Sequence, residues 1–265
     1  MKKGGFLYLL AVLFLASCCG DTASIIPISA SLDVGGNQLT DDIRQNYEVL
    51  IQKVQLTITN QNEVLGKMSY ELPFLVFNGG DDPCGLEKIN FVLRDRCSQF
   101  FKEDYSYFLQ RVSEKNASSA QYVNAISSQI AYQDENFLSI HQIQEWYTGG
   151  VISFSDFGMT FNLKSGALLS LEDFIDSSFH DFQECLLDYL YAESGKTSQM
   201  FQMFDDWRSI YRKSGFEDYE YYYSDGMLYI IEESFITSEA SKIVLWSIQD
   251  QAPVGIISGT ASNAA

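Results

Sequence analysis

DDPCGLEKINFVLRDRCSQFFKEDYSYFLQRVSEKNAS, residues 81–118, predicts one long helix in a chain whose other segments are mainly strand-like. Asp81 and Asp82 are helix-capping acids, and Pro83 suits the first helical position. Apolar residues then recur at steps of three and four: Leu86, Ile89, Leu93, Cys97, Phe101, Tyr105, Phe108 and Val112. That spacing forms one apolar stripe, which we expect to pack on a sheet.

Alternating apolar and polar residues predict strands on both sides of this helix. The predicted strands are 47–59, 67–76, 122–132, 137–147, 152–163, 219–224, 227–232 and 242–248. Pro73 places the second of them at an edge or a bulge, and Asp225-Gly226 predicts a hairpin turn. Further helical patterns begin at Ser170 and run over 179–192 and 199–213. Because helices and strands are segregated, we predict an α+β fold with a mixed or antiparallel sheet covered by the long helix, and with helices between the late strands.

The N-terminus predicts export and lipid attachment. Met1-Lys2-Lys3 precedes an apolar run from Phe6 to Ala16 that is too short to span a membrane, for which about 20 apolar residues are needed. Leu15-Ala16-Ser17-Cys18 resembles the lipobox of bacterial lipoproteins, in which the signal is cut before a cysteine that carries the lipid. The alternative is a plain secretory signal with Cys18 nearby. We therefore expect a signal peptide at 1–17, a tether at 18–44, one domain at 45–250 and a mobile tail at 251–265.

The composition is that of a folded, acidic protein. Hydrophobic residues make up 46% and aromatic residues 14%, and the formal net charge is −18, which becomes −20 once Lys2 and Lys3 leave with the signal. This charge argues against nucleic acid as a partner, because phosphate binding requires clustered Lys and Arg. It is compatible with a basic partner, and equally with solubility alone.

The cysteines of the domain are Cys84, Cys97 and Cys185. If Cys84 and Cys97 share the long helix, they lie about 20 Å apart, whereas a disulfide requires Cα atoms within about 7 Å. Either one is free to pair with Cys185, or all three are buried apolar residues. No Cys or His cluster has metal-ligand spacing, so we expect no metal and no cofactor.

Three stretches resemble the extracytoplasmic domain family of the anti-sigma factor RsiV, which also accompanies the peptidoglycan deacetylase PdaC. They are Tyr70-Glu71-Leu72-Pro73 with Asn78-Gly79-Gly80 and Ile89-Asn90, then Tyr147-Thr148-Gly149-Gly150 with residues 161–174, and finally residues 221–228. The resemblance implies an α+β domain outside the membrane that binds a ligand, lysozyme in the case of RsiV, and has no established chemistry. We expect this chain to be a lipoprotein without the sigma-binding segment.

Catalytic motifs are missing from the sequence. His141 and His180 are its only histidines, they are 39 residues apart, and no serine stands in a recognisable triad spacing. Asp156 with Glu172 or Asp173 offers a carboxylate pair for glycosidase chemistry, although any acidic protein contains such pairs.

Two segments are candidate binding residues. The first is the loop of Trp146, Tyr147, Thr148, Gly149 and Gly150, and the second is the strand with Tyr219, Tyr221 and Tyr223. Tyrosine and tryptophan beside acids are typical of surfaces that bind basic proteins or sugars. The sequence thus predicts a non-catalytic lipoprotein, lipid-anchored to a bacterial membrane and facing outward, that recognises a basic, lysozyme-like secreted protein or a cell-wall polysaccharide. Its rivals are an envelope glycan hydrolase and a structural or assembly lipoprotein. The sequence does not distinguish the inner from the outer membrane.

Overall fold

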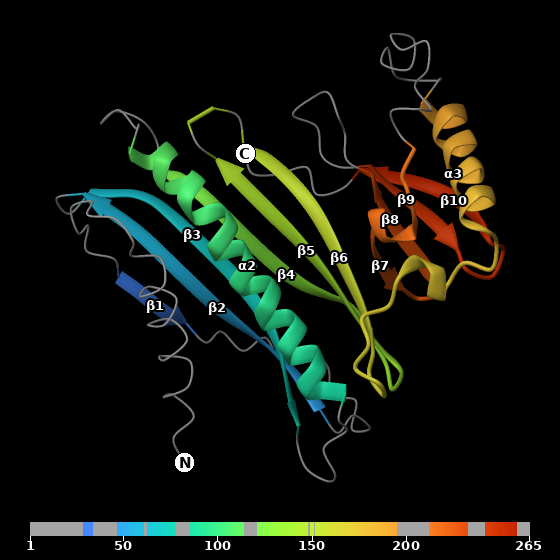
Figure 1. Cartoon of the computed structure of the whole chain (residues 1–265), viewed down its shortest axis with the longest axis horizontal. Coiled ribbons are helices and arrows are strands. Elements are labelled where there is room, and N and C mark those ends of the chain that lie inside the picture. Colours follow the sequence, from blue (N-terminus) through green and yellow to red (C-terminus); the bar gives the residue numbers. More distant parts are fainter. Residues whose placement is uncertain are drawn as a thin grey trace.

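A computed structural model describes residues 29–33, 47–60, 63–77, 85–113, 121–147, 149–150, 152–194, 212–232 and 242–258. These residues form two sheets and two long helices (Figure 1). The first sheet has the order β1 (Ser29–Asp33), β2 (Tyr47–Asn60), β3 (Glu63–Phe77), β4 (Tyr122–Gln133), β5 (Phe137–Tyr147) and β6 (Ser153–Asn162). The second has the order β10 (Ala252–Ser258), β9 (Lys242–Ser247), β8 (Met227–Glu232) and β7 (Glu220–Ser224). The predicted α+β class is confirmed.

Helix α2 (Gly85–Ser113) lies across one face of the first sheet (Figure 1). Its buried residues follow the predicted stripe and include Leu86, Ile89, Leu93, Cys97 and Phe108. Among the described strands only the β3–β4 pair is parallel, and α2 lies between these two strands in the chain. The first sheet is therefore mixed and covered by the long helix, as predicted.

Strand β3 stops pairing with β4 shortly before Pro73. The last β3–β4 pair is Tyr70 with Ile126, whereas β2 continues to pair with β3 through Phe77. Pro73 thus lies at a local edge, where its missing N–H costs no ladder bond. Beyond it, the Asn90 amide of α2 accepts from Leu75 N at 2.8 Å and donates to Leu75 O at 2.9 Å. The helix therefore supplies the hydrogen bonds that a neighbouring strand would supply.

The second sheet has a hydrophobic cluster of its own, shared with α3 (Phe179–Ser194). Phe182, Leu186 and Leu190 of α3 are buried with Trp246 of β9 and Leu228 of β8. Two short 3-10 turns flank this unit, η1 (Leu171–Asp173) and η2 (Phe216–Asp218). Helices between the late strands are thus confirmed for 179–194. The predicted helix at 199–213 lies almost wholly outside the described residues.

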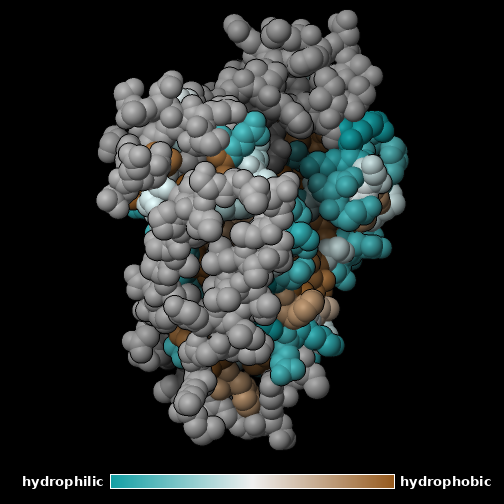
Figure 2. All heavy atoms as spheres, turned by 60° about the vertical axis from the view of Figure 1, so that its left-hand side comes forward, coloured by the Kyte–Doolittle hydropathy of each residue, from teal (hydrophilic) through white to brown (hydrophobic). Residues whose placement is uncertain are grey.

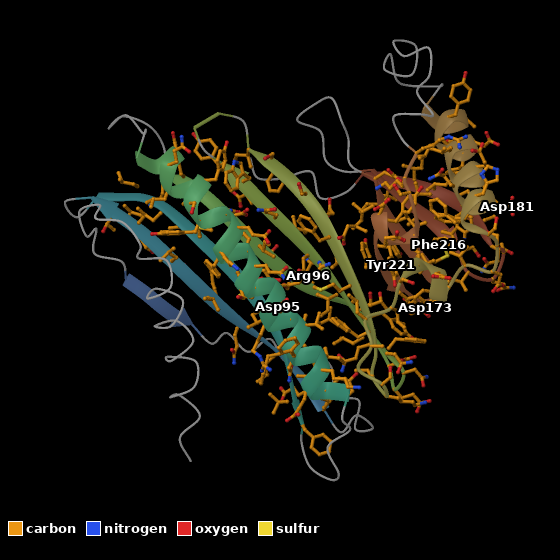
Figure 3. All side chains as sticks on the ribbon, in the orientation of Figure 1. Asp95, Arg96, Asp173, Asp181, Phe216 and Tyr221 are labelled. Carbon is orange, nitrogen blue, oxygen red and sulfur yellow. The ribbon has the colours of Figure 1, made fainter. Side chains whose placement is uncertain are left out.

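The two sheets meet where β7 crosses β6. Tyr223 N donates to Ser139 Oγ at 2.8 Å, and Ser224 Oγ donates to the Ala131 carbonyl at 3.1 Å. Glu220 accepts from Gly158 N at 3.3 Å and lies 3.8 Å from Arg96 of α2. Figure 3 shows Arg96 on α2 and Tyr221 in the second sheet. Hydrogen bonds from β4, β5 and β6 and an ion pair from α2 therefore fix the position of β7.

Two predicted boundaries are wrong. Ala252–Ser258, predicted as part of a mobile tail, pairs with β9 as strand β10, because its backbone continues the ladder after the turn at Gln251. Ser29–Asp33, predicted as tether, pairs with β2 from Lys53 to Thr57. The signal peptide, Cys18 and Thr148 lie outside the described residues. No helix among the described residues is long and apolar enough to cross a membrane.

The cysteine alternatives are partly resolved. Cys97 is buried and Cys185 is exposed, and both are free thiols, so the Cys97–Cys185 pair is not formed. Cys84 precedes the first described residue of α2 and is not described. Burial raises the pKa of the Cys97 thiol to about 12. Cys97 thus behaves as an apolar core residue.

Candidate functional site

A buried histidine–aspartate pair lies on the face of the first sheet opposite α2. His141 of β5 and Asp156 of β6 are joined by a 2.8 Å contact between Nε2 and Oδ1. Their side chains are 11% and 0% exposed. Because an ionised carboxylate only accepts hydrogen bonds, Nε2 carries the proton in this contact.

The strand register explains how the pair forms. The β5–β6 hairpin is centred on Gly149 and Gly150, so that His141 pairs with Gly158 and Ile143 pairs with Asp156. Residues two apart on a strand share a face, so Asp156 lies diagonally across from His141. Sequence reasoning missed this pair, although centring the two predicted strands on the glycine dipeptide would have revealed it.

Two tyrosines of the second sheet continue from the histidine as a stack of rings. Tyr222 lies parallel to the His141 ring at 4.4 Å between centroids, and Tyr229 lies parallel to Tyr222 at 4.6 Å. Burial raises the pKa of the Tyr222 phenol well above its usual value, and nearby Tyr229 and Asp156 raise it further. Tyr222 therefore presents a neutral ring to the histidine.

A recess of about 180 Å³ opens beside this stack, lined by Gln129, Ala131, His141, Tyr222, Ser224 and Tyr229. We call it the junction recess. Gln129 is exposed and Tyr229 is half-buried, so the recess is open to solvent. Nε2 of His141 is held by Asp156, and no hydrogen bond to its other ring nitrogen, Nδ1, is found among the described residues.

The lining of the junction recess includes one hydroxyl that could act as a nucleophile, that of Ser224. This hydroxyl donates to the Ala131 carbonyl and not to the histidine. No group of three His, Cys, Asp or Glu side chains among the described residues has the arrangement of a metal site.

The carboxylate pair considered for glycosidase chemistry is not assembled. Asp156 is buried and held by His141. Asp173 is instead exposed in η1, where it accepts from Ser170 N at 2.8 Å (Figure 3). Glu172 is also exposed. The carboxyl groups of Asp156 and Asp173 therefore make separate hydrogen bonds, one to His141 and the other to Ser170.

A second candidate surface lies where β5 ends and β6 begins. Trp146 is half-buried and stacks on Tyr107 of α2, with 5.6 Å between ring centroids and 21° between planes. Tyr107 is 54% exposed and Ile152 is 40% exposed. We call Tyr107, Trp146, Tyr147, Gly149, Gly150 and Ile152 the hairpin-tip surface.

Gly149 shapes this tip. Its φ is +93°, and a Cβ there would lie 2.9 Å from the Tyr122 hydroxyl. Glycine is favoured at such a φ because it has no side chain to clash. The chain therefore turns at Gly149-Gly150. It leaves both glycines exposed next to Tyr147, whose ring packs edge-on against Tyr122.

The predicted tyrosine surface on β7 is wrong for two of its three residues. Tyr219 and Tyr221 are each 5% exposed and belong to the core of the second sheet. The Tyr221 hydroxyl donates to the Leu169 carbonyl at 2.7 Å. Tyr223 is half-buried and stacks on Phe174. Sequence reasoning failed here because both faces of β7 are covered, one by α3 and its neighbours and the other by the first sheet.

The two predicted binding segments do not come together. Tyr223 binds Ser139, which lies seven positions from Trp146 on β5. At about 3.3 Å per residue this is a distance of roughly 23 Å. Positions of opposite parity also point to opposite faces, so Trp146 faces α2 and Ser139 faces β7. The hairpin-tip surface and the junction recess are therefore separate sites.

Comparisons with known proteins give a likeness in fold alone. No protein-family model matches the chain, and no curated protein matches it either. Among solved structures, a DUF3298 family protein from Pseudomonas aeruginosa PAO1 is similar, with 11% sequence identity and a TM-score of 0.44. The matched region covers 71% of this chain and 83% of the Pseudomonas chain. A DUF3298 family member from Bacteroides fragilis NCTC 9343 shows 13% identity, 80% and 90% coverage and a TM-score of 0.37. Both neighbours are described as members of the DUF3298 family, and at these identities and TM-scores they assign no activity to this chain.

Proposed function

We propose that this protein is a lipid-anchored, non-catalytic binding protein of the bacterial cell envelope, and that it binds its ligand at the hairpin-tip surface. The observation that carries the proposal is the Tyr107–Trp146 stack, which presents a rigid pair of rings at an exposed glycine turn. Large aromatic side chains dominate binding energy when they are accessible. The surface joins two elements distant in sequence, so its geometry is fixed by the fold.

A basic secreted protein is the ligand class that suits this surface best. Glu103 of α2 is exposed and lies four positions before Tyr107, so the two side chains share one side of the helix. The chain as a whole carries a net charge of −18. Figure 2 shows hydrophilic side chains on part of the described surface. The net negative charge of the chain attracts a positively charged partner and raises its association rate. The RsiV-like motifs suggest a lysozyme-like protein.

Binding is tested with the full chain, purified in detergent, against lysozyme at low salt and at about 0.5 M salt, where screening acts within a few ångströms. We expect saturable binding that salt weakens. Tyr107→Ala should weaken binding roughly tenfold or more, the effect of removing an aromatic anchor. Tyr191→Ala on α3 is the matched control, because Tyr191 is 51% exposed, as Tyr107 is 54% exposed.

The same experiment separates the rival functions. No binding of lysozyme, or equal loss from Tyr107→Ala and Tyr191→Ala, would refute the proposal. Release of soluble sugar from purified peptidoglycan would instead favour the envelope hydrolase. Failure to bind either lysozyme or peptidoglycan would leave the structural or assembly lipoprotein.

The anchor has its own test. Cys18→Ala should release the protein from membranes into the soluble extracytoplasmic fraction and abolish labelling with a radioactive fatty acid. Stable anchoring of a lipoprotein requires more than one acyl chain or a second signal. Cys19→Ala, at the neighbouring position, is the control and should remain in the membrane. Unchanged retention and labelling of the Cys18 variant would contradict lipid attachment at this residue.

A further inference from the structure

The described lining of the junction recess contains no Lys, Arg, Asp or Glu side chain, although a carboxyl group, that of Asp156, is buried directly behind it. Burying a carboxyl group is costly. The polar groups of the recess are the Gln129 amide, the Ser224 hydroxyl and His141, and its walls are the Tyr222 and Tyr229 rings with the Ala131 methyl. Asp156 lies behind His141 and is 2% exposed. Replacing both partners of a buried hydrogen bond by apolar groups of the same shape is often nearly neutral or stabilising. Stability alone therefore does not account for the pair.

His141 is fixed in a way that suits ligand recognition. The contact from Nε2 to Asp156 and the parallel contact with Tyr222 together hold the plane of the imidazole. When Nε2 donates to the carboxylate, a neutral imidazole presents Nδ1 as an acceptor. A donor on a ligand would thus meet a preoriented acceptor.

Charge and size narrow the class of ligand. Among the described residues no Lys or Arg lines the recess, and Asp156 lies beneath it, so an anion is disfavoured. The described lining contains no Asp or Glu either, so a cation would find no carboxylate there to pair with. Sites for drug-sized ligands have volumes of about 300–1,000 Å³, whereas this recess has about 180 Å³. A single neutral ring fits these limits.

We propose that the junction recess binds one neutral sugar ring. A sugar ring carries hydroxyl groups around its edge and C–H groups on its faces. The hydroxyls suit the Gln129 amide, the Ser224 hydroxyl and His141 Nδ1, and the C–H faces suit the tyrosine rings. Because the recess is open at Gln129, the ring can be one unit of a longer chain. This site lies on the opposite face from the hairpin-tip surface and does not depend on the function proposed for that surface.

The test is ligand-observed saturation-transfer NMR with the full chain, in a detergent whose headgroup contains no sugar. The neutral probes are glucose and N-acetylglucosamine, and glucuronate and glucosamine are the charged counterparts. We expect saturation transfer to at least one neutral probe and much weaker transfer to its charged counterparts. Gln129→Ala should weaken the binding about three- to tenfold, the effect of losing one neutral hydrogen bond.

Control variants locate the site. Gln129 is exposed, so its substitution should leave the melting temperature unchanged. Tyr229→Leu removes the outer ring and should also weaken binding, whereas Tyr107→Ala at the hairpin tip should not. No transfer to either neutral probe, or transfer that Gln129→Ala leaves unchanged, would overturn the proposal. A loss caused by Tyr107→Ala but not by Gln129→Ala would move sugar binding to the hairpin tip.

Discussion

Gly158 allows the second sheet to approach the first, and its replacement by alanine should be strongly destabilising. A Cβ at this position would lie 1.8 Å from the Tyr221 carbonyl oxygen and 2.2 Å from the carbonyl carbon. These atoms are backbone and cannot rotate away. Since Cβ contacts below 3.0 Å essentially never occur, β7 would have to move away from β6 by about 1.2 Å, the difference between the two distances.

The cost follows from the contacts at this junction. A shift of this size stretches the 2.8 Å bond from Tyr223 N to Ser139 Oγ beyond hydrogen-bonding distance, and also the 3.3 Å bond from Gly158 N to Glu220. Two lost hydrogen bonds cost about 2 kcal/mol, and overpacking adds about 1–3 kcal/mol. We expect Gly158→Ala to reduce the free energy of unfolding by about 3–5 kcal/mol, the sum of these two costs.

The assay is urea unfolding of the full chain followed by circular dichroism. Gly150→Ala is the matched control, because Gly150 is exposed, has no atom within 4 Å of a Cβ and has no positive φ. It should change the free energy of unfolding by less than about 1 kcal/mol, and in the stabilising direction. If Gly158→Ala were as stable as Gly150→Ala, the contact between β6 and β7 would be refuted.

Three further predictions concern buried ionisable groups. His141→Ala should lower the free energy of unfolding by about 3–5 kcal/mol, because it leaves the Asp156 carboxylate buried without its histidine. The double variant His141→Ala/Asp156→Ala should lose about 0.5–3 kcal/mol less free energy of unfolding than the two single variants lose when their losses are added. Losses that add exactly in urea unfolding would contradict an interaction between the two side chains. In the folded protein at pH 8, iodoacetamide should label Cys185 and leave Cys97 unlabelled, because Cys97 is buried and burial raises the pKa of its thiol to about 12. Peptide mass spectrometry measures the labelling of each cysteine. Equal labelling would place Cys97 outside the core. Stability should fall in alkali, because burial also raises the pKa of Tyr70 to about 12 from 10.0. Above pH 9 the Tyr70 phenol loses its proton in the unfolded chain before it does in the folded chain, so the stability present below pH 9 is lost progressively toward pH 12. A free energy of unfolding that stays constant from pH 8 to pH 11.5 would contradict this prediction.

The long helix was readable from sequence because its signal is local. A stripe from Leu86 to Phe108 needs only the 3.6-residue period and a sheet to cover. The hairpin at Asp225-Gly226 was equally local, since Asp225 has a φ of 48° and Gly226 a φ of 81°, which few residue pairs tolerate. Strand β10 was missed because Ala252–Ser258 lacks a clear alternation, and its stability comes from pairing with β9.

The sequence by itself determined the fold class, the α2 helix, most strands and the hairpin turn at Asp225-Gly226, because each depends on residues close together in the chain. Only the tertiary structure decided which side chains meet. Tyr107 and Trp146 are 39 positions apart, and His141 and Tyr222 are 81 positions apart, yet each pair stacks. Likewise, the alternation on β7 showed two faces but not that Tyr219 and Tyr221 are buried, because burial depends on what packs against each face. Periodicity assigns a residue to a face, and only packing decides whether that face is covered or exposed to a ligand.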